Sequence, residues 1–378
     1  MSLSNDIKDA ALNMGYCKVG ITTADDFEPF MEELLSRGDQ YDYWTHGAAS
    51  LVEGASPRKT LPSAKSIIVT AFDYMQKSFP EKLLPMIGRA YLSRTYLPKA
   101  DMIHGARIEL FKQYLESLGC TVAMNRYLPL RPAAMRAGVM NFGRNNFAYV
   151  DGIGSFVILY AFMVDKELEY DDPTPKNTCP KGCTACMDAC PTQAIYAPFR
   201  LNPRRCVGFN NWMRQDGRGE SLGAVAPVDI REKLGIRVHG CDICQEVCPG
   251  NRAKLKARLP RDEFLEIIAK DFSLDALLHM PEGFHRKRVY PVMYNYINEP
   301  KYFQRNAAIA IGNTGDEAYV PALITELANP EPLVRRHVAW ALGKIGGGRA
   351  KQALEKSLLG ESDAGVAQEI RLAQAMAR

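Results

Sequence analysis

The residues of this chain whose type and spacing could do chemistry are cysteines. Eight of its ten cysteines fall between positions 179 and 248. The bacterial ferredoxin pattern C-x2-C-x2-C-x3-C-P holds cubane iron–sulfur clusters through thiolates. The chain has Cys179-x3-Cys183-x2-Cys186-x3-Cys190-Pro191, then an isolated Cys206, then Cys241-x2-Cys244-x3-Cys248-Pro249. The first run is one residue longer than the ferredoxin pattern in its first gap, and the eight thiols make two sets of four.

The spacing also predicts how the thiols divide between two 4Fe-4S clusters. In two-cluster ferredoxins, the last cysteine of each run ligates the other run's cluster. By that logic the expected ligands of one cluster are Cys179, Cys183, Cys186 and Cys248. The expected ligands of the other are Cys190, Cys206, Cys241 and Cys244. Structural zinc stays open as an alternative, since C-x2-C pairs also bind zinc tetrahedrally. The remaining cysteines, Cys17 and Cys120, lie on apolar segments and are expected to be ordinary buried thiols.

Composition places the chain among globular proteins. Of its 378 residues, 47% are hydrophobic and 24% are charged, which excludes a disordered chain. The formal net charge of +4 permits an anionic partner without requiring one. The apolar run from Phe156 to Val164 is about half as long as a spanning helix needs, so no membrane association is expected. The opening MSLSNDIKDAALNMGY has no export signal, so we expect a cytoplasmic protein whose cysteines bind metal instead of forming disulfides.

The first 165 residues predict an α+β region. The continuous apolar run over 66–72 is typical of a buried central strand. Residues 101–119 have helical apolar spacing and end at a glycine, which predicts an amphipathic helix. The stretches 121–128 and 154–164 are strand-like.

The C-terminal part predicts a helical solenoid. The segments RNAAIAIGN and RRHVAWALGKIG recur at a spacing of about 30 residues, each followed by a second helical stretch, as in HEAT-like repeats. Basic residues accumulate along this part of the chain, and they are either a solvated face or a surface for an RNA backbone. They are Arg286, Lys287, Arg288, Arg305, Arg335, Arg336, Lys344, Arg349 and Lys351.

The whole chain resembles the epoxyqueuosine reductase family of tRNA modification, in the order of its motifs. The resemblance is carried by GYCKVGIT, ASPRKTLPSAKSIIV, RPAAMRAGVMNFGRNN, the cysteine block with CPTQAI, and the two solenoid motifs. It implies an α+β nitroreductase-like, cobalamin-binding core over 1–170. A ferredoxin-like double-cluster domain over 171–260 and a HEAT-like α-solenoid over 261–378 would follow. The implied cofactors are two 4Fe-4S clusters and base-off cobalamin, which carries the difficult chemistry while the protein supplies placement, electrons and a proton.

The resemblance also implies individual cofactor contacts. Arg58 matches an arginine that contacts cobalamin in the family. Ala137, Gly138, Gly143 and Arg144 match a glycine-containing segment whose backbone approaches the corrin closely. His104 is expected to be a packing or surface residue of a helix instead of a cobalt ligand.

The same resemblance exposes departures around the expected active site. The family places an aspartate, its expected proton donor, where this chain has Met124 to Tyr127, and none of these four residues is a carboxylate. The family's Asp-Tyr-His triplet is replaced over 94–97, and VGFNNW follows Cys206 in place of the family's sequence. A tyrosine beside a cation can act as an acid. Tyr127, beside Arg126, is therefore one candidate proton donor, and Tyr96, close after Arg94, is the second. The alternative is that both tyrosines only pack, with their hydroxyls hydrogen-bonded.

These departures favour a cobalamin-dependent iron–sulfur reductase that acts on an unidentified substrate. A low-potential ferredoxin or flavodoxin would supply its electrons. The first alternative is a true epoxyqueuosine reductase with a relocated acid, which contacts tRNA through the basic C-terminal repeats. The second is an electron-transfer protein for corrinoids that has no substrate of its own.

Overall fold

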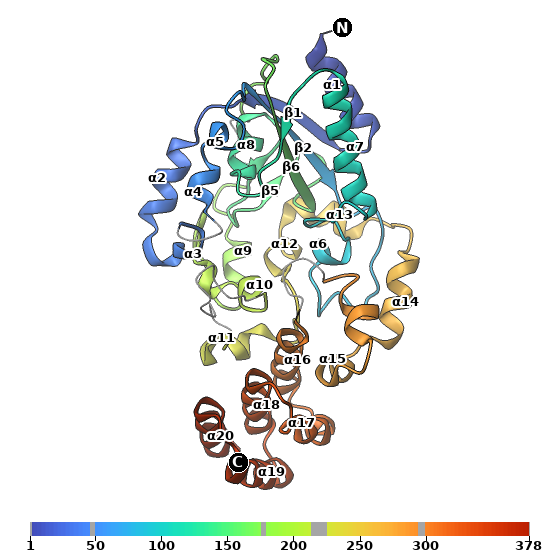
Figure 1. Ribbon diagram of the computed structural model, residues 1–378. Coiled ribbons are helices and arrows are strands. Elements are labelled where there is room, and N and C mark those ends of the chain that lie inside the picture. The colour runs from blue at the N-terminus through green and yellow to red at the C-terminus, as the bar shows by residue number, and fades with distance from the viewer. Residues whose placement is uncertain (1, 46–49, 175–178, 213–224, 294–298, 378) are drawn as a thin grey trace.

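A four-stranded antiparallel sheet organises the N-terminal half of the computed structural model (Figure 1). The structure describes residues 2–45, 50–174, 179–212, 225–293 and 299–377. The strand order is β1-β2-β6-β3. The strands are β1 (Lys18–Thr23), β2 (Ser66–Asp73), β6 (Val157–Val164) and β3 (Val122–Ala123). Every pairing between them is antiparallel, so the predicted α+β class is observed.

Both faces of this sheet are covered, which explains why its central strands are apolar along their whole length. Helices α1 (Leu3–Asn13) and α7 (Ile103–Ser117) lie on one face, where Ile68 and Phe162 are fully buried. Helix α8 (Leu130–Arg136) packs on the other face, against alternate residues of β2 and β6 such as Val69 and Ala161. The short helices α2 (Glu28–Ser36), α3 (Asp42–Thr45), α4 (Leu51–Gly54) and α5 (Pro57–Thr60) lie beside α8.

The strand expected over 121–128 is only two residues long. After Ala123 the chain leaves the sheet, because the Asn125 side chain accepts a hydrogen bond from the Tyr127 backbone N–H at 2.8 Å and closes a turn. Pro129 then precedes α8. The expected strand therefore becomes the loop that carries Arg126 and Tyr127.

The middle of the chain is built from single helical turns and loops. They include α6 (Arg89–Leu92), α9 (Ala185–Asp188), α10 (Val207–Asn210), α11 (Val228–Arg231), α12 (Ile243–Glu246) and α13 (Arg252–Lys256). Two small hairpins accompany them: β4 (Asn141–Phe142) with β5 (Ala148–Tyr149), and β7 (Ile195–Ala197) with β8 (Arg200–Leu201). Helices α14 (Glu263–Asp271) and α15 (Leu274–His279) lead to the C-terminal part.

The C-terminal part is the expected stack of helices, at the foot of Figure 1. It consists of α16 (Pro300–Thr314), α17 (Val320–Glu326), α18 (Pro332–Ile345), α19 (Gly348–Gly360) and α20 (Ala364–Met376). Gly312 and Gly343 allow the long helices to touch, since a Cβ at Gly312 would lie 2.9 Å from the Cα of Ala341 and one at Gly343 would lie 2.6 Å from the Cα of Ala373.

The solenoid is joined to the middle of the chain by buried polar contacts. The Asn306 side chain donates to the backbone carbonyls of Asn211 and Val238, both at 2.7 Å. Asn313 donates to the carbonyls of Arg231 and Gly235. These contacts fix the first solenoid helix, α16, against the part of the chain that carries the cysteines.

Candidate active site and cysteine cavities

The eight clustered cysteines surround two separate cavities, four around each. The first cysteine cavity has a volume of about 260 Å³, and the second has a volume of about 300 Å³. The cysteines that line the first are Cys179, Cys183, Cys186 and Cys248. Those that line the second are Cys190, Cys206, Cys241 and Cys244. The two sets coincide with the two ligand sets expected from the ferredoxin spacing.

Two similar helical turns present these thiols. Cys186 is the second residue of α9 and Cys244 is the second residue of α12. Each turn is followed within a few residues by Cys-Pro, and the proline directs the chain away from the cavity. The turns α9 and α12 pack against each other, which brings Cys248, beyond the end of α12, to the cavity that contains Cys186.

Burial makes these thiols poor acids in the absence of a positive group. It raises the pKa of Cys186, Cys206 and Cys244, and it raises the pKa of Cys241 to about 12. A thiolate is the form that ligates metal, so a cationic centre in each cavity would be needed to hold these groups deprotonated. The chemistry of four thiols around each cavity fits an iron–sulfur cluster.

Backbone amides already point at some of the sulfur atoms. The N–H of Arg144 donates to Cys179 Sγ at 3.4 Å, and the N–H of Ala194 donates to Cys190 Sγ at 3.2 Å. Hydrogen bonds to sulfur stabilise negative charge and are one of the means by which a protein sets a cluster's potential. The Arg144 guanidinium donates to the carbonyl of Cys183, which fixes this side chain beside the first cysteine cavity.

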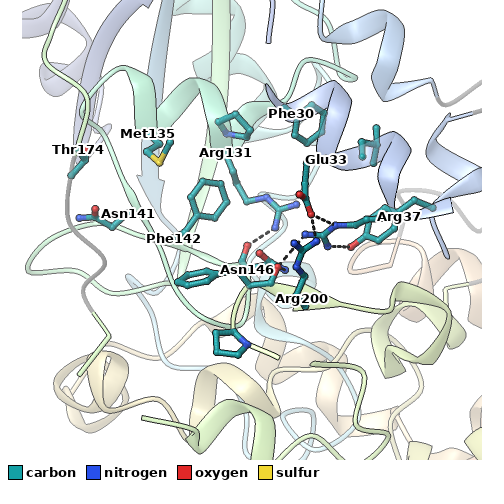
Figure 2. A pocket seen from close by; sticks show the side chains of 15 residues that line it. Phe30, Glu33, Arg37, Arg131, Met135, Asn141, Phe142, Asn146, Thr174 and Arg200 are labelled. Carbon is teal, nitrogen blue, oxygen red and sulfur yellow. Dashed lines mark hydrogen bonds and ion pairs between the residues drawn. The ribbon is translucent and has the colours of Figure 1, made fainter. Parts of the chain in front are cut away.

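A larger cavity of about 600 Å³ lies beside the sheet and the cysteine region (Figure 2). We call it the arginine cavity, because Arg37, Arg131 and Arg200 line it. Glu33 is its acidic residue among the described residues, and it pairs with both Arg37, at 2.8 Å, and Arg200. Three guanidinium groups and one carboxylate leave the cavity positively charged.

Arg131 is the cation of this cavity that has no ion-pair partner among the described residues. Its guanidinium donates to the backbone carbonyl of Asn146 (Figure 2). Burial lowers the pKa of Arg131, although the side chain is open to the cavity itself. The cavity walls are otherwise largely aromatic and apolar, with Phe30, Phe142 and Met135 among them. Such a site favours a large, partly apolar and anionic ligand.

The hairpin between β4 and β5 is a wall common to all three cavities. Asn146 lines the arginine cavity. Arg144 lines the first cysteine cavity and Phe147 lines the second. Asn145 lines both cysteine cavities. The five-residue loop between β4 and β5 therefore borders the arginine cavity and both cysteine cavities.

Of the five expected cobalamin contacts, Arg144 lines the first cysteine cavity, and Arg58, Ala137, Gly138 and Gly143 line none of the three cavities. Ala137 is buried at the end of α8, and Gly138 has a φ of +68°, which favours glycine. A Cβ at Gly143 would lie 2.2 Å from the ring of Tyr149, so this glycine serves internal packing. Arg58 forms an exposed ion pair with Asp25 at 3.4 Å.

The three expected catalytic residues lie on two different segments. The Arg126 guanidinium stacks 4.8 Å from the ring of Tyr127. The loop that carries them is joined to α5, the helix of Arg58, because Asn125 donates to the hydroxyl of Thr60 at 2.7 Å. Tyr96 lines the second cysteine cavity.

The expected cation next to Tyr96 is engaged elsewhere. Arg94 forms an ion pair with the buried Asp262 at 2.6 Å, and its ring neighbour is Phe264. Tyr96 instead packs edge-on against Tyr91, with ring centroids 5.4 Å apart. The stacking of a guanidinium on a tyrosine ring is thus present at Tyr127, whereas the Arg94 guanidinium lies over the ring of Phe264.

Most of the basic residues expected on the solenoid surface have structural partners. Arg305 is fully buried, and the pKa of its guanidinium is lowered to about 10 by burial. Arg335 pairs with Glu361 and Arg336 pairs with Glu369. The expectation that Arg305 contributes to a surface is wrong, because its guanidinium is bonded to Asn306 inside the protein. The expected cations that do lie exposed are Arg286, Lys287, Arg349, Lys351 and Lys344, of which Lys344 pairs with Glu232 at 2.7 Å.

The two cysteines outside the cavities and His104 have packing roles, as expected from the sequence. Cys120 is buried, while Cys17 is half-buried with its thiol 3.2 Å from the carbonyl of Ala71, and neither lines a cysteine cavity. His104 lies against Phe72 and shares a hydrogen bond with Arg107 at 2.9 Å. Burial lowers the pKa of His104 to about 4.

Sequence reasoning did not find the α2 side of the arginine cavity. Phe30, Glu33 and Arg37 lie on or directly after α2, and Tyr41 follows in the next turn. No local motif marks them, since their helical spacing is that of an ordinary surface helix. Arg200, from β8, comes to the same cavity from a distant part of the chain.

Comparison with known proteins defines the class of this protein. Residues 179–251 match the family described as "4Fe-4S double cluster binding domain", and residues 292–375 match "HEAT repeats". With the geometry above, the chain is an iron–sulfur oxidoreductase with a C-terminal solenoid. No helix in the described ranges is long and apolar enough to cross a membrane.

The particular family follows from full-length relatives. The chain is 30% identical to the epoxyqueuosine reductase of Vibrio cholerae over 359 residues, which cover 90% of this chain and 91% of that protein. It is 29% identical to that of Bacillus subtilis over 370 residues, with 96% and 92% covered. The chain belongs to the epoxyqueuosine reductase family.

Solved structures agree with this assignment. The structure of the Bacillus subtilis epoxyqueuosine reductase with its catalytic aspartate loop swung out of the active site superposes with a TM-score of 0.83, at 28% identity, and covers 100% of this chain and 99% of that one. An epoxyqueuosine reductase in complex with an epoxyqueuosine-modified tRNA-Tyr stem loop gives a TM-score of 0.82, also at 28% identity, with 99% and 98% covered.

Proposed function

We propose that this protein reduces epoxyqueuosine to queuosine in tRNA. The observation that carries the proposal is the full-length likeness to epoxyqueuosine reductases, in sequence and in structure. The expectation of an unidentified substrate is not supported, since the relatives agree on one activity and the first alternative fits them better. The second alternative, an electron-transfer protein without a substrate of its own, fits the relatives less well, because they are enzymes.

The two cysteine cavities would hold the two 4Fe-4S clusters. Two observations support the ligand sets: the ferredoxin-type spacing and the four thiols around each cavity. Removing the oxygen of an epoxide to leave an alkene takes two electrons and two protons and releases water. A pair of one-electron clusters is suited to deliver those electrons in succession.

The cobalamin expected from the family resemblance fits the arginine cavity in chemistry. Cobalamin is large, largely apolar in its ring system, and carries an anionic phosphodiester in its nucleotide tail. Arg131 is placed to pair with such a phosphate, and Phe30 and Phe142 offer apolar walls. Cobalamin, when bound, supplies a strongly reducing cobalt centre. Met135, Asn141, Phe142 and Asn146 line this cavity, and the expected contacts Ala137, Gly138, Gly143 and Arg144 lie in the same stretch of the sequence.

The protons must come from groups other than the family's aspartate. No carboxylate lies on the loop from Met124 to Tyr127. We assign proton delivery to the Tyr127 hydroxyl, because the Arg126 guanidinium over its ring stabilises the phenolate that remains. Tyr96 is the second candidate, since it lines a cavity next to the clusters. A ferredoxin or flavodoxin would supply the electrons from outside.

The tRNA would be recognised by exposed cations. Arg286, Lys287, Arg349 and Lys351 are exposed in the C-terminal part, and Arg126 is exposed at the candidate active site. Phosphate contacts of this kind give affinity that falls with salt. Of the other basic residues expected on this surface, Arg288, Arg335, Arg336 and Lys344 are held in ion pairs and Arg305 is buried, so they would contribute less to it.

The direct test is conversion of epoxyqueuosine-containing tRNA. The protein is purified anaerobically, loaded with iron, sulfide and cobalamin, and incubated with the tRNA and a strong chemical reductant. The expected result is queuosine, detected by mass spectrometry of the digested nucleosides. Protein that carries both clusters and cobalamin but leaves epoxyqueuosine unchanged, while the Bacillus subtilis enzyme converts it, would contradict the proposed substrate.

A further inference from the structure

The two cysteine cavities differ in how far they open to solvent. Six of the residues that line the first cavity are exposed, whereas Phe147 is the exposed one among the described residues that line the second. The six are Asp151, Gly152, Pro180, Pro249, Gly250 and Ala253. A cluster in the first cavity would therefore lie close to the surface, where a partner protein can reach it.

Glycines leave the mouth of the first cavity free of side chains. A Cβ at Gly152, or at Gly182 directly before Cys183, would meet no atom within 4 Å, so both positions face open space. Gly250 is exposed, and a Cβ there would lie 3.6 Å from Sγ of Cys248. No side chain at position 250 covers this sulfur, so the backbone of a partner can approach it closely.

Three exposed cations surround this mouth. Lys181 follows Pro180, and Arg252 precedes Ala253, and both of these neighbours line the cavity. Arg252 and Lys256 are the first and last residues of α13, and because they are four positions apart they lie on the same side of this helical turn. None of the three cations forms an ion pair with another residue of the described ranges.

The mouth of the first cavity is positively charged as a result. Asp151 is the acidic residue among the described ones that line it. Lys254, the remaining cation of α13, is neutralised by an ion pair with Asp73. Three unpaired cations against one carboxylate leave an excess of positive charge. Such a surface attracts an acidic partner and speeds the encounter with it.

The second cluster site has an opening of its own, but that opening has no excess charge. A cavity of about 280 Å³ is lined by Cys241 together with Arg237, Asp242 and Glu246. Both carboxylates pair with Arg89, at 3.1 and 2.5 Å. Two cations and two carboxylates therefore balance, and this opening is less suited to an acidic partner than the mouth of the first cavity.

We propose that the mouth of the first cysteine cavity, framed by Lys181, Arg252 and Lys256, is the docking surface for an acidic one-electron carrier protein of the flavodoxin type. The anionic flavin hydroquinone of the carrier gives one electron to the oxidised cluster and becomes the neutral semiquinone. Two such encounters supply the two electrons of one turnover. The inference rests on the proposed function in that a 4Fe-4S cluster occupies this cavity, and it adds the place where electrons enter.

The test measures how fast a reduced flavodoxin reduces the clusters. Full-length protein loaded with both clusters is mixed anaerobically with flavodoxin hydroquinone, and formation of the flavin semiquinone is followed by stopped-flow absorption. A variant with both Arg252→Glu and Lys256→Glu is expected to react at least about ten-fold more slowly at low ionic strength, since electrostatic steering raises association rates about 10- to 10³-fold. Added salt should narrow the difference, because it screens exposed charges.

The matched control reverses two exposed cations elsewhere, with Lys59→Glu and Lys65→Glu. Lys65 directly precedes β2, whose other end carries the Asp73 that pairs with α13. The eight residues of β2 span roughly 26 Å, so the control changes charge far from the docking surface. Lys59 lies on α5, which is also well apart from α13 in Figure 1. The control should react at the rate of the unmodified protein, and dithionite should reduce the clusters of every variant to the same final extent.

Several outcomes would overturn the docking surface. The Arg252→Glu, Lys256→Glu variant could react as fast as its control, or flavodoxin could fail to reduce the unmodified protein. Arg237→Glu could slow the reaction more than the double variant does, which would move docking to the opening beside Cys241. The double variant could instead lose affinity for tRNA while it reacts with flavodoxin at the full rate, which would assign these cations to RNA.

Failure of the proposed function gives a different result. Protein that leaves epoxyqueuosine unchanged, although flavodoxin reduces its clusters and the double variant is slow, would overturn the proposed function and leave the docking surface standing. Protein whose purified and reconstituted forms both contain no iron would overturn the two together.

Discussion

Arg231 and Glu369 form a buried bidentate ion pair, in which the guanidinium donates to both carboxylate oxygens at 2.7 and 3.1 Å. Their side chains are 1% and 3% exposed. Arg231 ends α11, close to the cysteine region, and Glu369 lies on the last helix of the solenoid. A second cation, Arg336, also contacts Glu369 at 3.1 Å. The pair holds the far end of the solenoid to the rest of the protein.

Removal of one partner should therefore destabilise the protein strongly. Glu369→Ala leaves Arg231 buried without a counter-charge, and such losses cost about 3–5 kcal/mol of the free energy of unfolding. Urea unfolding followed by circular dichroism measures the change. The exposed pair Lys344–Glu232, at 2.7 Å, is the matched control, and Lys344→Ala should change the stability by less than about 1 kcal/mol. Equal effects of the two substitutions would contradict the structural role of the buried pair.

The assignment of Cys206 to the second cluster predicts a defined loss of iron. Cys206→Ala should lower the iron content from about eight per chain toward about four, because one of two clusters loses a ligand. Chemical iron analysis and absorption spectra measure this. Cys120→Ala removes a buried thiol that lines neither cavity and should leave the iron content unchanged. Full iron content in Cys206→Ala would mean that this ligand is wrongly assigned.

If Tyr127 delivers the proton, its hydroxyl is needed for turnover but not for the binding of the clusters or of cobalamin. Tyr127→Phe should lower the rate of queuosine formation about 10²- to 10⁴-fold, the usual contribution of a positioned acid. Its cluster and cobalamin spectra should match those of the unmodified protein. Tyr96→Phe serves as the comparison, since Tyr96 is the second candidate proton donor and lines the second cysteine cavity. A larger loss in Tyr96→Phe would transfer the role to Tyr96.

The unpaired cation of the arginine cavity predicts a contribution to cobalamin binding. Arg131→Met replaces the methylene part of the side chain with an unbranched apolar chain of similar length and removes the charged guanidinium. A hydrogen bond to a charged group contributes about 1.5–3 kcal/mol, so the affinity for cobalamin should fall roughly 10- to 100-fold. Equilibrium dialysis with cobalamin measures this without any turnover. Arg349→Met, at an exposed solenoid position, is the control. Unchanged affinity in Arg131→Met would place the cofactor outside this cavity.

The burial of His337 leads us to expect that the protein loses stability in mild acid. It is fully buried in α18, and its Nδ1 lies 2.8 Å from the carbonyl of Leu333. Burial lowers the pKa of His337 well below its usual value, and the nearby Arg231, Arg305 and Arg336 lower it further. The imidazole is thus neutral in the folded protein but takes up a proton in the unfolded chain below about pH 6.5.

The sign of this linkage is that stability falls as the pH falls below about 6.5, by up to about 1.4 kcal/mol per pH unit for one proton. Urea unfolding at pH 7.5 and at pH 5.5 measures the difference. His337→Leu cannot take up that proton, so its stability should fall less between the two pH values. An identical pH dependence in the variant would show that other groups cause the loss.

The parts of this molecule that the sequence predicted depend on short-range patterns. The cysteine spacing located all eight thiols of the two cavities, because a few residues of loop fix which sulfur atoms can share a centre. The apolar runs predicted β2 and β6, since strands buried on both faces are apolar throughout. The helical period predicted α7 to within two residues at each end.

What the sequence did not show depends on contacts between distant segments. Arg305 looked like a surface cation, and only the packing of α16 against residues 210–211 and 231–238 shows that it is buried. Arg94 was paired with Tyr96 by proximity in the chain, whereas Asp262, far along the chain, takes its guanidinium. The arginine cavity is lined by residues of α2, α8 and β8, and no local sequence pattern indicates that these elements lie side by side.

The loop of the β4–β5 hairpin borders the arginine cavity and both cysteine cavities. Because these three cavities share one wall, a change in that wall alters the shape of all of them. A substitution that moves Asn145 or Asn146 would alter iron–sulfur and corrinoid loading together, and a hairpin left unformed during maturation would delay all of them. For this reason we expect evolutionary change in this protein to concentrate on loops such as residues 124–127, which line none of these three cavities.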